Sequence, residues 1–141
     1  SALTGSFAEN KGRLLFPVSG KYRITRHFGR HPHPTLPNVE TENSGIDIEV
    51  ASGTAARAVF SGKVSAIFRQ EGFNSIIMVR HGKYITIYAG LDNIAVRQGD
   101  TVKAGQNLGM ITAGSENSGR AVLHFEIRNE RQKLNPTQWV R

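Results

Sequence analysis

The sequence contains no cysteine and no long apolar run. Zero cysteines among 141 residues exclude disulfide bonds, thiolate metal ligands and thiol nucleophiles. The longest apolar stretches, such as residues 75–79, are much shorter than the roughly 18 residues that a membrane-spanning helix needs, so we expect no insertion into a membrane. Residues 1–6 have neither a basic start nor an apolar run, and no signal peptide is expected among them.

Acidic residues are outnumbered. The chain has 18 Lys and Arg against 11 Asp and Glu, which gives a formal net charge of +7 and favours anionic partners. The arginines are scattered through the chain rather than gathered in a run, so the sequence predicts no nucleic-acid site. A length of 141 residues with 38% hydrophobic residues is typical of one folded domain with its own core.

Short β-type runs and glycines make up most of the chain. Fifteen glycines interrupt these runs, and no stretch with a period of about 3.6 residues is long enough to predict a helix. Residues 76–79 and 84–88 flank residues 80–83, which predicts a hairpin with Gly82 in the left-handed region. Further strands are predicted at 23–28, 45–50, 56–59, 62–68, 94–96, 106–111 and 122–128. We therefore expect an all-β, mainly antiparallel fold that resembles a barrel or sandwich.

Two segments interrupt the strand pattern. The proline-rich segment 31–37 and the segment 114–119 are rich in turn residues, and both are expected to be exposed loops. Residues 1–15 are expected to form an N-terminal arm. This arm would lead into a single domain that spans residues 16–141.

A set of ordered landmarks runs from about residue 16 to the end of the chain. They are residues 16–18 (FPV), 24–29 (ITRHFG), 44–48 (SGIDI), 58–64 (AVFSGKV), 87–91 (IYAGL), 102–109 (VKAGQNLG), 123–128 (LHFEIR) and 135–136 (NP). In this order they resemble the lysostaphin-type (LytM) peptidase domain, a family of zinc endopeptidases that cleave peptidoglycan cross-bridges. The resemblance implies an antiparallel LytM-type sheet with a groove.

The resemblance also implies where a zinc site would lie. Active members hold zinc by a His and an Asp four residues apart and by the second His of a His-x-His pair, and another His follows a Tyr by two residues. At these positions the present sequence has Asn43 and Asp47, Val122 and His124, and Tyr88 and Gly90. Val122 and Gly90 have no group that can transfer a proton or stabilise an oxyanion. We therefore expect no catalytic residues, no zinc and no other cofactor, with Asp47 and His124 as residual ligand positions.

Degenerate members of this family activate separate cell-wall amidases. The resemblance implies that the present chain is a non-catalytic activator of a peptidoglycan (N-acetylmuramoyl-L-alanine) amidase in the bacterial cell envelope, in the periplasm. It would bind the amidase through the vacated groove, and peptidoglycan is a further expected partner. The expected partner-binding residues are Arg26, Asn43, Asp47, Tyr88, Gly90, Val122 and His124.

Two other functions remain open on the sequence. A peptidoglycan-binding scaffold module without an effector role is consistent with the charge of +7. A zinc endopeptidase with an unusual ligand set would recruit His31 or His33 in place of the missing histidine. Phe73 is expected either at the rim of the groove or in a local apolar cluster.

Overall fold

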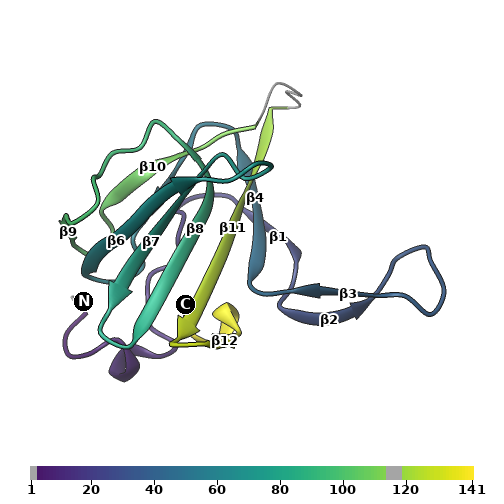
Figure 1. The fold of residues 1–141 in the computed structure, drawn as a ribbon, viewed down its shortest axis with the longest axis horizontal. Coiled ribbons are helices and arrows are strands. Elements are labelled where there is room, and N and C mark those ends of the chain that lie inside the picture. The colour runs from purple at the N-terminus through teal and green to yellow at the C-terminus, as the bar shows by residue number, and fades with distance from the viewer. Residues whose placement is uncertain (1–2, 114–118) are drawn as a thin grey trace.

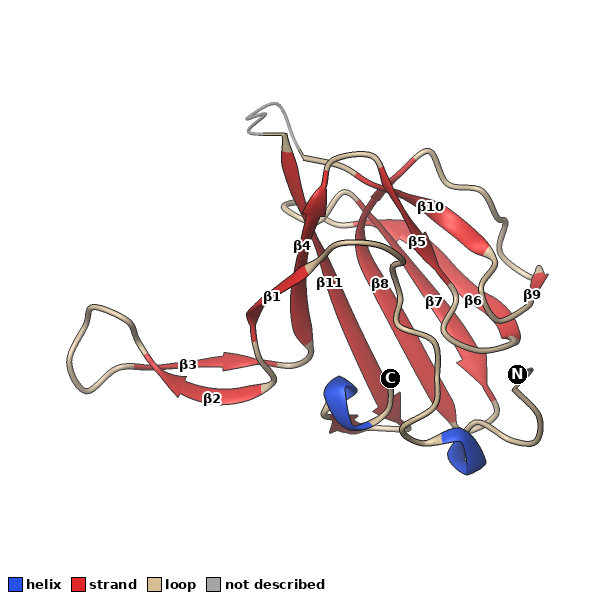
Figure 2. Cartoon of the chain, turned by 180° about the vertical axis from the view of Figure 1, so that it is seen from behind, coloured by secondary structure: helices blue, strands red, loops and turns tan. Residues whose placement is uncertain are grey.

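The computed structural model describes residues 3–113 and 119–141, which form β-strands and two short 3-10 helices (Figure 1, Figure 2). The strands are β1 (Arg23–Arg26), β2 (Gly29–Pro32), β3 (Glu40–Asn43), β4 (Ile46–Ala51), β5 (Thr54–Arg57), β6 (Gly62–Arg69), β7 (Ser75–His81), β8 (Tyr84–Asp92), β9 (Thr101–Val102), β10 (Asn107–Ile111), β11 (Arg120–Asn129) and β12 (Gln132–Leu134). The 3-10 helices are Ala8–Asn10 and Pro136–Gln138. The predicted all-β, mainly antiparallel fold is confirmed. Within these ranges no helix is long and apolar enough to cross a membrane.

Most of the predicted strands are present, and the β7–β8 hairpin is confirmed. Gly82 has a φ of +69°, the left-handed conformation that the sequence predicted. The strand predicted at residues 94–96 is absent. Ala95 makes one backbone hydrogen bond to the carbonyl of Leu108, and Ile94 packs against the core from a loop.

The segment 31–37 is a loop only in part, because His31 and Pro32 end strand β2, which pairs with β3. This two-stranded hairpin projects away from the main sheet (Figure 1). Neither of its faces is covered by the core, so its sequence lacks the alternation of apolar and polar residues that marks a strand. Pro32 is tolerated at the end of a strand in this exposed ribbon. Residues 114–118 of the other expected loop lie outside the described residues.

The main sheet has the strand order β1-β4-β11-β8-β7-β6-β9, with β5 and β10 paired off this path. Figure 2 shows β5 and the segment that leads into β1 crossing in front of the long strands. The core lies between these two layers, and its largest fully buried side chains are Tyr88, Phe125, Leu14, Ile46, Ile48, Ile77, Leu91, Leu108, Ile111, Leu123, Ile127 and Val18. A second, small apolar cluster consists of Ile76, Ile85, Ile87 and Ala89.

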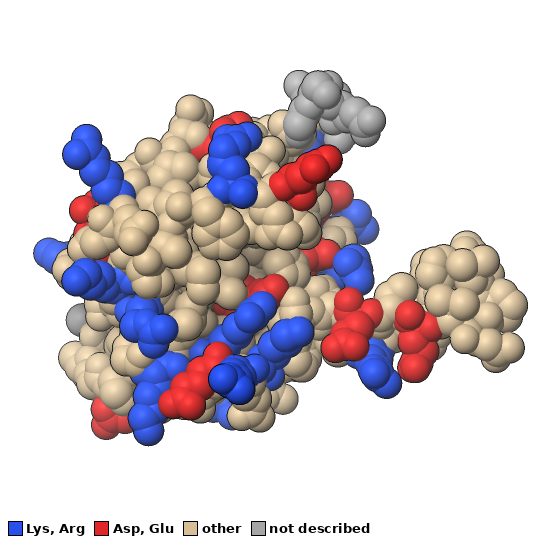
Figure 3. Space-filling view, viewed as in Figure 1, with Lys and Arg blue, Asp and Glu red and all other residues tan. Residues whose placement is uncertain are grey.

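The charged side chains are unevenly distributed. Figure 3 shows Lys and Arg gathered across the lower part of one face, over the ends of β7, β8 and β11 in Figure 1. This is the face that carries the small apolar cluster and the groove described below.

The expected N-terminal arm packs against the core. Phe7 is 3% exposed, and its ring stacks on the rings of His81 and Tyr84 at centroid distances of 4.7 and 4.8 Å. Leu14 is fully buried and forms an isolated parallel bridge with Val140. Residues before position 16 therefore contribute to the core, and the division of the chain into arm and domain stays a prediction.

Replacing Phe7 with Ala is expected to lower the free energy of unfolding by about 3–5 kcal/mol, because a buried aromatic side chain and its ring contacts are lost. Phe68→Ala is the matched control, since this side chain is 43% exposed and its loss should cost less than about 1 kcal/mol. Urea denaturation measures both values. Equal costs for the two variants would mean that residues 1–15 add nothing to the core.

Candidate functional site

The register of the strands organises the groove-bearing face. Residues directly opposite each other in an antiparallel pair point to the same face of a sheet. One unbroken series of such pairs crosses β6, β7, β8, β11, β4 and β1, and it consists of Phe68, Ile76, Ala89, His124, Asp47 and Arg26. We name this series the site row. It brings Asp47 and His124 together although 77 positions separate them in the sequence.

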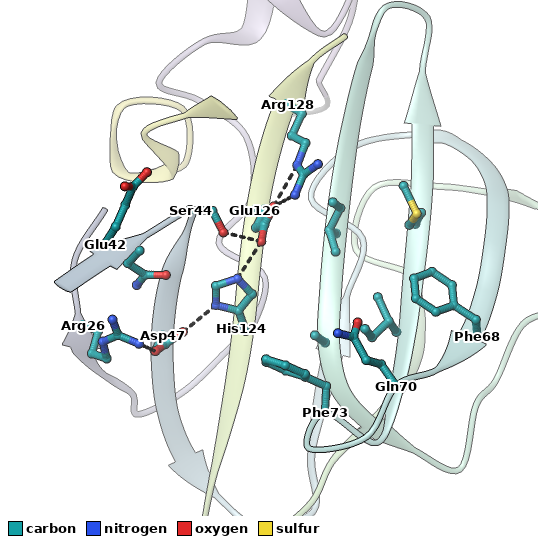
Figure 4. Close-up of a pocket in the computed structure, with 15 residues that line it drawn as sticks. Arg26, Glu42, Ser44, Asp47, Phe68, Gln70, Phe73, His124, Glu126 and Arg128 are labelled. Carbon is teal, nitrogen blue, oxygen red and sulfur yellow. Dashed lines mark hydrogen bonds and ion pairs between the residues drawn. The ribbon is translucent and has the colours of Figure 1, made fainter. Parts of the chain in front are cut away.

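The site row lies in a groove of about 510 Å³ (Figure 4). Four of the predicted residues line this groove, namely Arg26, Asn43, Asp47 and His124. Gly90 and Val122 line an adjoining hollow, which shares Asp47 and His124 with the groove. Six of the seven expected residues are thus brought to one region of the surface.

Tyr88, the seventh expected residue, does not line the groove. It is fully buried, and its hydroxyl accepts hydrogen bonds from the Val59 N–H at 3.1 Å and from the Thr86 hydroxyl at 3.0 Å. Burial raises the pKa of Tyr88 to about 12, and the two hydrogen bonds, which lower this pKa, have a smaller effect. The cause is strand alternation: Ala89 belongs to the site row, so the residue before it must point into the core.

A chain of charged groups continues along the site row and β11 (Figure 4). His124 Nδ1 lies 2.6 Å from Asp47 Oδ1, and His124 Nε2 lies 2.7 Å from Glu126 Oε2. An arginine stands at each end of the chain. Arg26 Nη1 lies 3.5 Å from Asp47 Oδ2, and Arg128 donates two hydrogen bonds to Glu126 Oε1, at 2.8 and 2.6 Å. The result is a series of alternating charges that ends in a cation on both sides.

Glu126 is a site residue that the sequence analysis missed. It is only 6% exposed, and besides His124 and Arg128 the Ser44 hydroxyl donates a hydrogen bond to it at 2.7 Å. Its signal in the sequence was its position two residues after His124 on a strand, which places both side chains on one face. An acidic residue in a strand is otherwise ordinary, so no motif singled it out.

The two carboxylates determine the protonation state of His124. Burial by itself lowers the pKa of His124, but the hydrogen bonds and charges of Asp47 and Glu126 outweigh burial and raise it to about 9. Burial raises the pKa of Glu126, but its hydrogen bonds, that from His124 foremost, outweigh burial and lower it to about 2. At neutral pH His124 is therefore a cation held between two anions.

This donor set does not fit the zinc site that the resemblance implies. Of the implied ligand positions, only Asp47 and His124 carry groups that bind zinc readily, and catalytic zinc sites use three protein ligands. Asn43 stands at the first ligand position, and its Oδ1 accepts a hydrogen bond from the Gly45 N–H at 3.3 Å. His31 and His33 line a separate hollow beside β1. Among the described residues no three His, Asp or Glu side chains are placed to hold a metal ion together.

Gly90 occupies a β-bulge in β8 at the edge of the groove. The pairing of β7 with β8 shifts register between Ser75 and Ile76, which leaves Gly90 as the extra residue. Its φ is +104°, and a Cβ atom at this position would lie 2.7 Å from the carbonyl oxygen of Val122. A histidine cannot occupy the position without a movement of the backbone. The site therefore has neither a side chain at this position nor space for one.

The other half of the groove is apolar. Its lining includes Ile76, Met78, Ile87 and Ala89. Two aromatic side chains, Phe68 and Phe73, are 43% and 42% exposed beside this lining (Figure 4). The ring of Phe73 lies 6.2 Å from that of His124, so Phe73 occupies the groove rim, one of its two expected places. Exposed aromatic side chains around an apolar surface are typical of binding sites.

Known proteins share this fold and sequence pattern. The sequence profile of peptidase family M23 matches residues 41–136. The chain is 38% identical over 128 residues to the uncharacterized lipoprotein YgeR of Escherichia coli, covering 89% of this chain and 46% of that protein. It is 36% identical over 127 residues to the murein hydrolase activator NlpD of Salmonella dublin (89% and 30% covered) and 28% identical over 138 residues to the murein hydrolase activator EnvC of E. coli (97% and 31% covered). The chain thus spans less than half the length of these relatives.

Solved structures of related proteins have the same fold as this chain. A zinc-containing peptidase from Vibrio cholerae superimposes with a TM-score of 0.76 at 26% identity, over 90% of this chain and 40% of that one. Lysostaphin superimposes with a TM-score of 0.67 at 26% identity, over 82% of this chain and 48% of that one. The similarity extends over most of the described sheet.

His124 and His81 are expected to titrate in opposite directions from the ordinary value of about 6.5. The pKa of His124 is raised to about 9, whereas burial lowers that of His81 to about 4 despite its hydrogen bond to the Ser61 carbonyl. NMR of the ring nitrogens at pH 7 should therefore show that both nitrogens of His124 are protonated. In His81 only one ring nitrogen should be protonated.

A His124→Gln variant assigns the signals and tests the energetic consequence. Because the folded-state pKa of His124 is raised, its stabilising effect is complete below about pH 6.5 and is lost as the pH rises through about 9. The stability deficit of the variant should therefore shrink between pH 7 and pH 10. A His124 pKa at or below 6.5, or loss of one of its ring protons on addition of equimolar zinc, would contradict the assigned network.

Gly90→Ala is expected to be more destabilising than Gly53→Ala. Both glycines have positive φ, +104° and +93°, so both variants incur the backbone strain of about 1–3 kcal/mol. Only Gly90 also approaches another backbone atom, since nothing lies within 4 Å of a Cβ at Gly53. An extra cost of about 1 kcal/mol or more is expected in urea denaturation. Equal costs would remove the close approach to Val122 as a constraint on the site.

Proposed function

Since the chain belongs to peptidase family M23, we propose that it is a non-catalytic activator of a peptidoglycan (N-acetylmuramoyl-L-alanine) amidase and binds this enzyme through the groove. Two relatives, NlpD and EnvC, are named murein hydrolase activators. Two further relatives, YgeR of E. coli and the outer membrane antigenic lipoprotein B of Haemophilus influenzae, are named lipoproteins. These names support a place in the cell envelope, and we assign the chain to the periplasm. Peptidoglycan is a second proposed partner.

The observation that carries the proposal is the absence of imidazoles from three positions of the site, where Asn43, Gly90 and Val122 stand. Asp47 and His124 alone supply fewer than the three protein ligands of a catalytic zinc site. The bulge at Gly90 removes the place of a second imidazole, and Val122 has no polar group. These features support a surface that binds without hydrolysing a peptide and without a metal cofactor.

The groove offers both apolar and polar contacts to a protein segment. Phe68 and Phe73 expose aromatic surface, and the side chain of Arg26 is 52% exposed with only a long contact of 3.5 Å to Asp47. Aromatic and arginine side chains are enriched in binding hot spots. Asn43 is 4% exposed, and its Nδ2 has no hydrogen-bond partner within the described part of the chain. An unpaired buried donor of this kind costs about 1–3 kcal/mol.

Activation by such a surface follows from differential binding. An autoinhibited amidase exists as closed and open forms, and a protein that binds the open form more tightly shifts the population toward it. The groove would do so by holding the amidase segment that otherwise blocks the active site. No chemistry is required of the activator, which agrees with a site built from fixed ion pairs.

The purified domain is expected to raise the rate of an autoinhibited amidase on isolated peptidoglycan, and Arg26→Ala is expected to weaken this effect. Loss of a hot-spot arginine should increase the half-activating concentration by about tenfold or more. The measurement is release of soluble peptidoglycan fragments at increasing concentrations of the domain.

Arg97→Ala is the control, because Arg97 is an exposed arginine that lines neither the groove nor the adjoining hollow. It should activate like the wild type. Peptidoglycan binding without any effect on the amidase would favour a scaffold module. Zinc-dependent cleavage of peptidoglycan by the domain alone, abolished in His124→Gln, would establish an endopeptidase and end the activator proposal.

A further inference from the structure

A second row of opposed residues crosses the groove-bearing face below the site row. The strand register pairs Lys63 with Arg80, Arg80 with Ile85, Ile85 with Arg128, and Arg128 with Lys133. These residues come from β6, β7, β8, β11 and β12, and directly opposed residues share one face. We name Lys63, Arg80, Arg128 and Lys133 the basic row. Figure 3 shows Lys and Arg across the lower part of this face, with acidic side chains among them.

The basic row contains two like-charged cross-strand pairs. Lys63 stands opposite Arg80, and Arg128 stands opposite Lys133. Like charges directly opposite each other destabilise a sheet, whereas opposite charges at the same positions stabilise it. The two pairs of like charges therefore lower the stability of the sheet. Replacing one residue of each pair with an acidic residue would remove this repulsion. A bound anion offsets this repulsion.

Most of the row is free to bind. Among the described residues, Lys63, Arg80 and Lys133 form no ion pair, and all three are exposed. The exception is Arg128, which is bound to Glu126. By contrast, the exposed arginines of β1, β2 and the start of β11 each have a carboxylate partner.

The central part of the row is well ordered. Ile85 is only 9% exposed although it lies on the outer face, and its neighbours in the row are Arg80 and Arg128. Long arginine stems cover apolar surface while their charged ends remain in water. Arg80 Nη1 also donates a hydrogen bond to the Gly82 carbonyl at 3.1 Å. Such fixed guanidinium groups lose less conformational entropy when they bind an anion.

The row is linear and has further cations at its edge. Neighbouring strands lie about 4.8 Å apart, so the four intervals from Lys63 to Lys133 span roughly 19 Å. The β7–β8 and β11–β12 turns lie side by side, joined by a hydrogen bond from the Glu130 N–H to the Lys83 carbonyl, and they add the exposed Lys83 and Arg131. A single anion can meet one or two of these cations. A chain of anionic groups can meet all of them.

We propose that the basic row binds a linear phosphate-bearing polymer that lies across the strands. This surface is separate from the groove in all but Arg128, and the proposal does not depend on an amidase partner. The probe is long-chain inorganic polyphosphate, with triphosphate and anionic phospholipid vesicles as comparison ligands. Binding is measured by titration calorimetry at several salt concentrations.

The test variant is Lys63→Gln/Arg80→Gln/Lys133→Gln, which leaves Arg128 and the groove intact. The control variant is Lys21→Gln/Arg97→Gln/Lys103→Gln, which removes the same number of exposed cations elsewhere on the surface. The test variant is expected to lose at least about tenfold in affinity for polyphosphate at 0.1 M salt. The slope of log K against log salt should fall by about 2, since each lost phosphate contact contributes about 0.7. The control variant should stay within about threefold of the wild type.

Folding of the test variant is checked by thermal denaturation. It should melt within about 5 °C of the wild type, because the relieved repulsion between Lys63 and Arg80 and between Arg128 and Lys133 offsets the lost hydrogen bond from Arg80 to the Gly82 carbonyl. Equal losses in both variants would show an effect of net charge and overturn the proposal. Binding of triphosphate as tightly as polyphosphate, or of vesicles in place of polyphosphate, would overturn it as well.

Discussion

The register of the antiparallel strands is the constraint on which both surfaces depend. Opposed residues share a face, so the alignment of β6, β7, β8 and β11 underlies both rows. Strands β4 and β1 extend it to the site row, and β12 extends it, four residues along β11, to the basic row. A slip of one residue would send His124 into the core and bring Phe125 to the groove. The positions of the side chains on this face therefore depend on how the strands pair. The hydrophobic core on the other face of the sheet fixes this pairing.

Beside the site row, a protonated imidazole balances the charge of two carboxylates. Asp47 and Glu126 are partly or largely buried carboxylates, and bringing them close together without a cation would be costly. A protonated His124 between them supplies that cation and satisfies both with short hydrogen bonds. The raised pKa of His124 and the lowered pKa of Glu126 are two expressions of this one interaction.

Prediction from sequence succeeded where a pattern is local and failed where it depends on pairing. The β7–β8 hairpin followed from glycine placement, whereas the meeting of Asp47 with His124 was implied by the family resemblance. The β2–β3 hairpin was missed because its exposed faces carry no alternation. Tyr88, which the resemblance placed in the groove, points into the core because its neighbour Ala89 belongs to the site row. The only signal for Glu126 was its position two residues after His124, because its role depends on Ser44 and Arg128 also meeting around it.

The site face is held together by contacts among its own side chains. Glu126 contacts His124 Nε2 and is itself held by Ser44 and Arg128. The bulge at Gly90 leaves no space for a side chain unless the backbone moves. Arg128 then joins the two surfaces, because its guanidinium serves Glu126 and also belongs to the basic row. An anion that draws on Arg128 weakens its hold on Glu126, so by linkage the occupancy of the row and the charge balance of the groove affect each other.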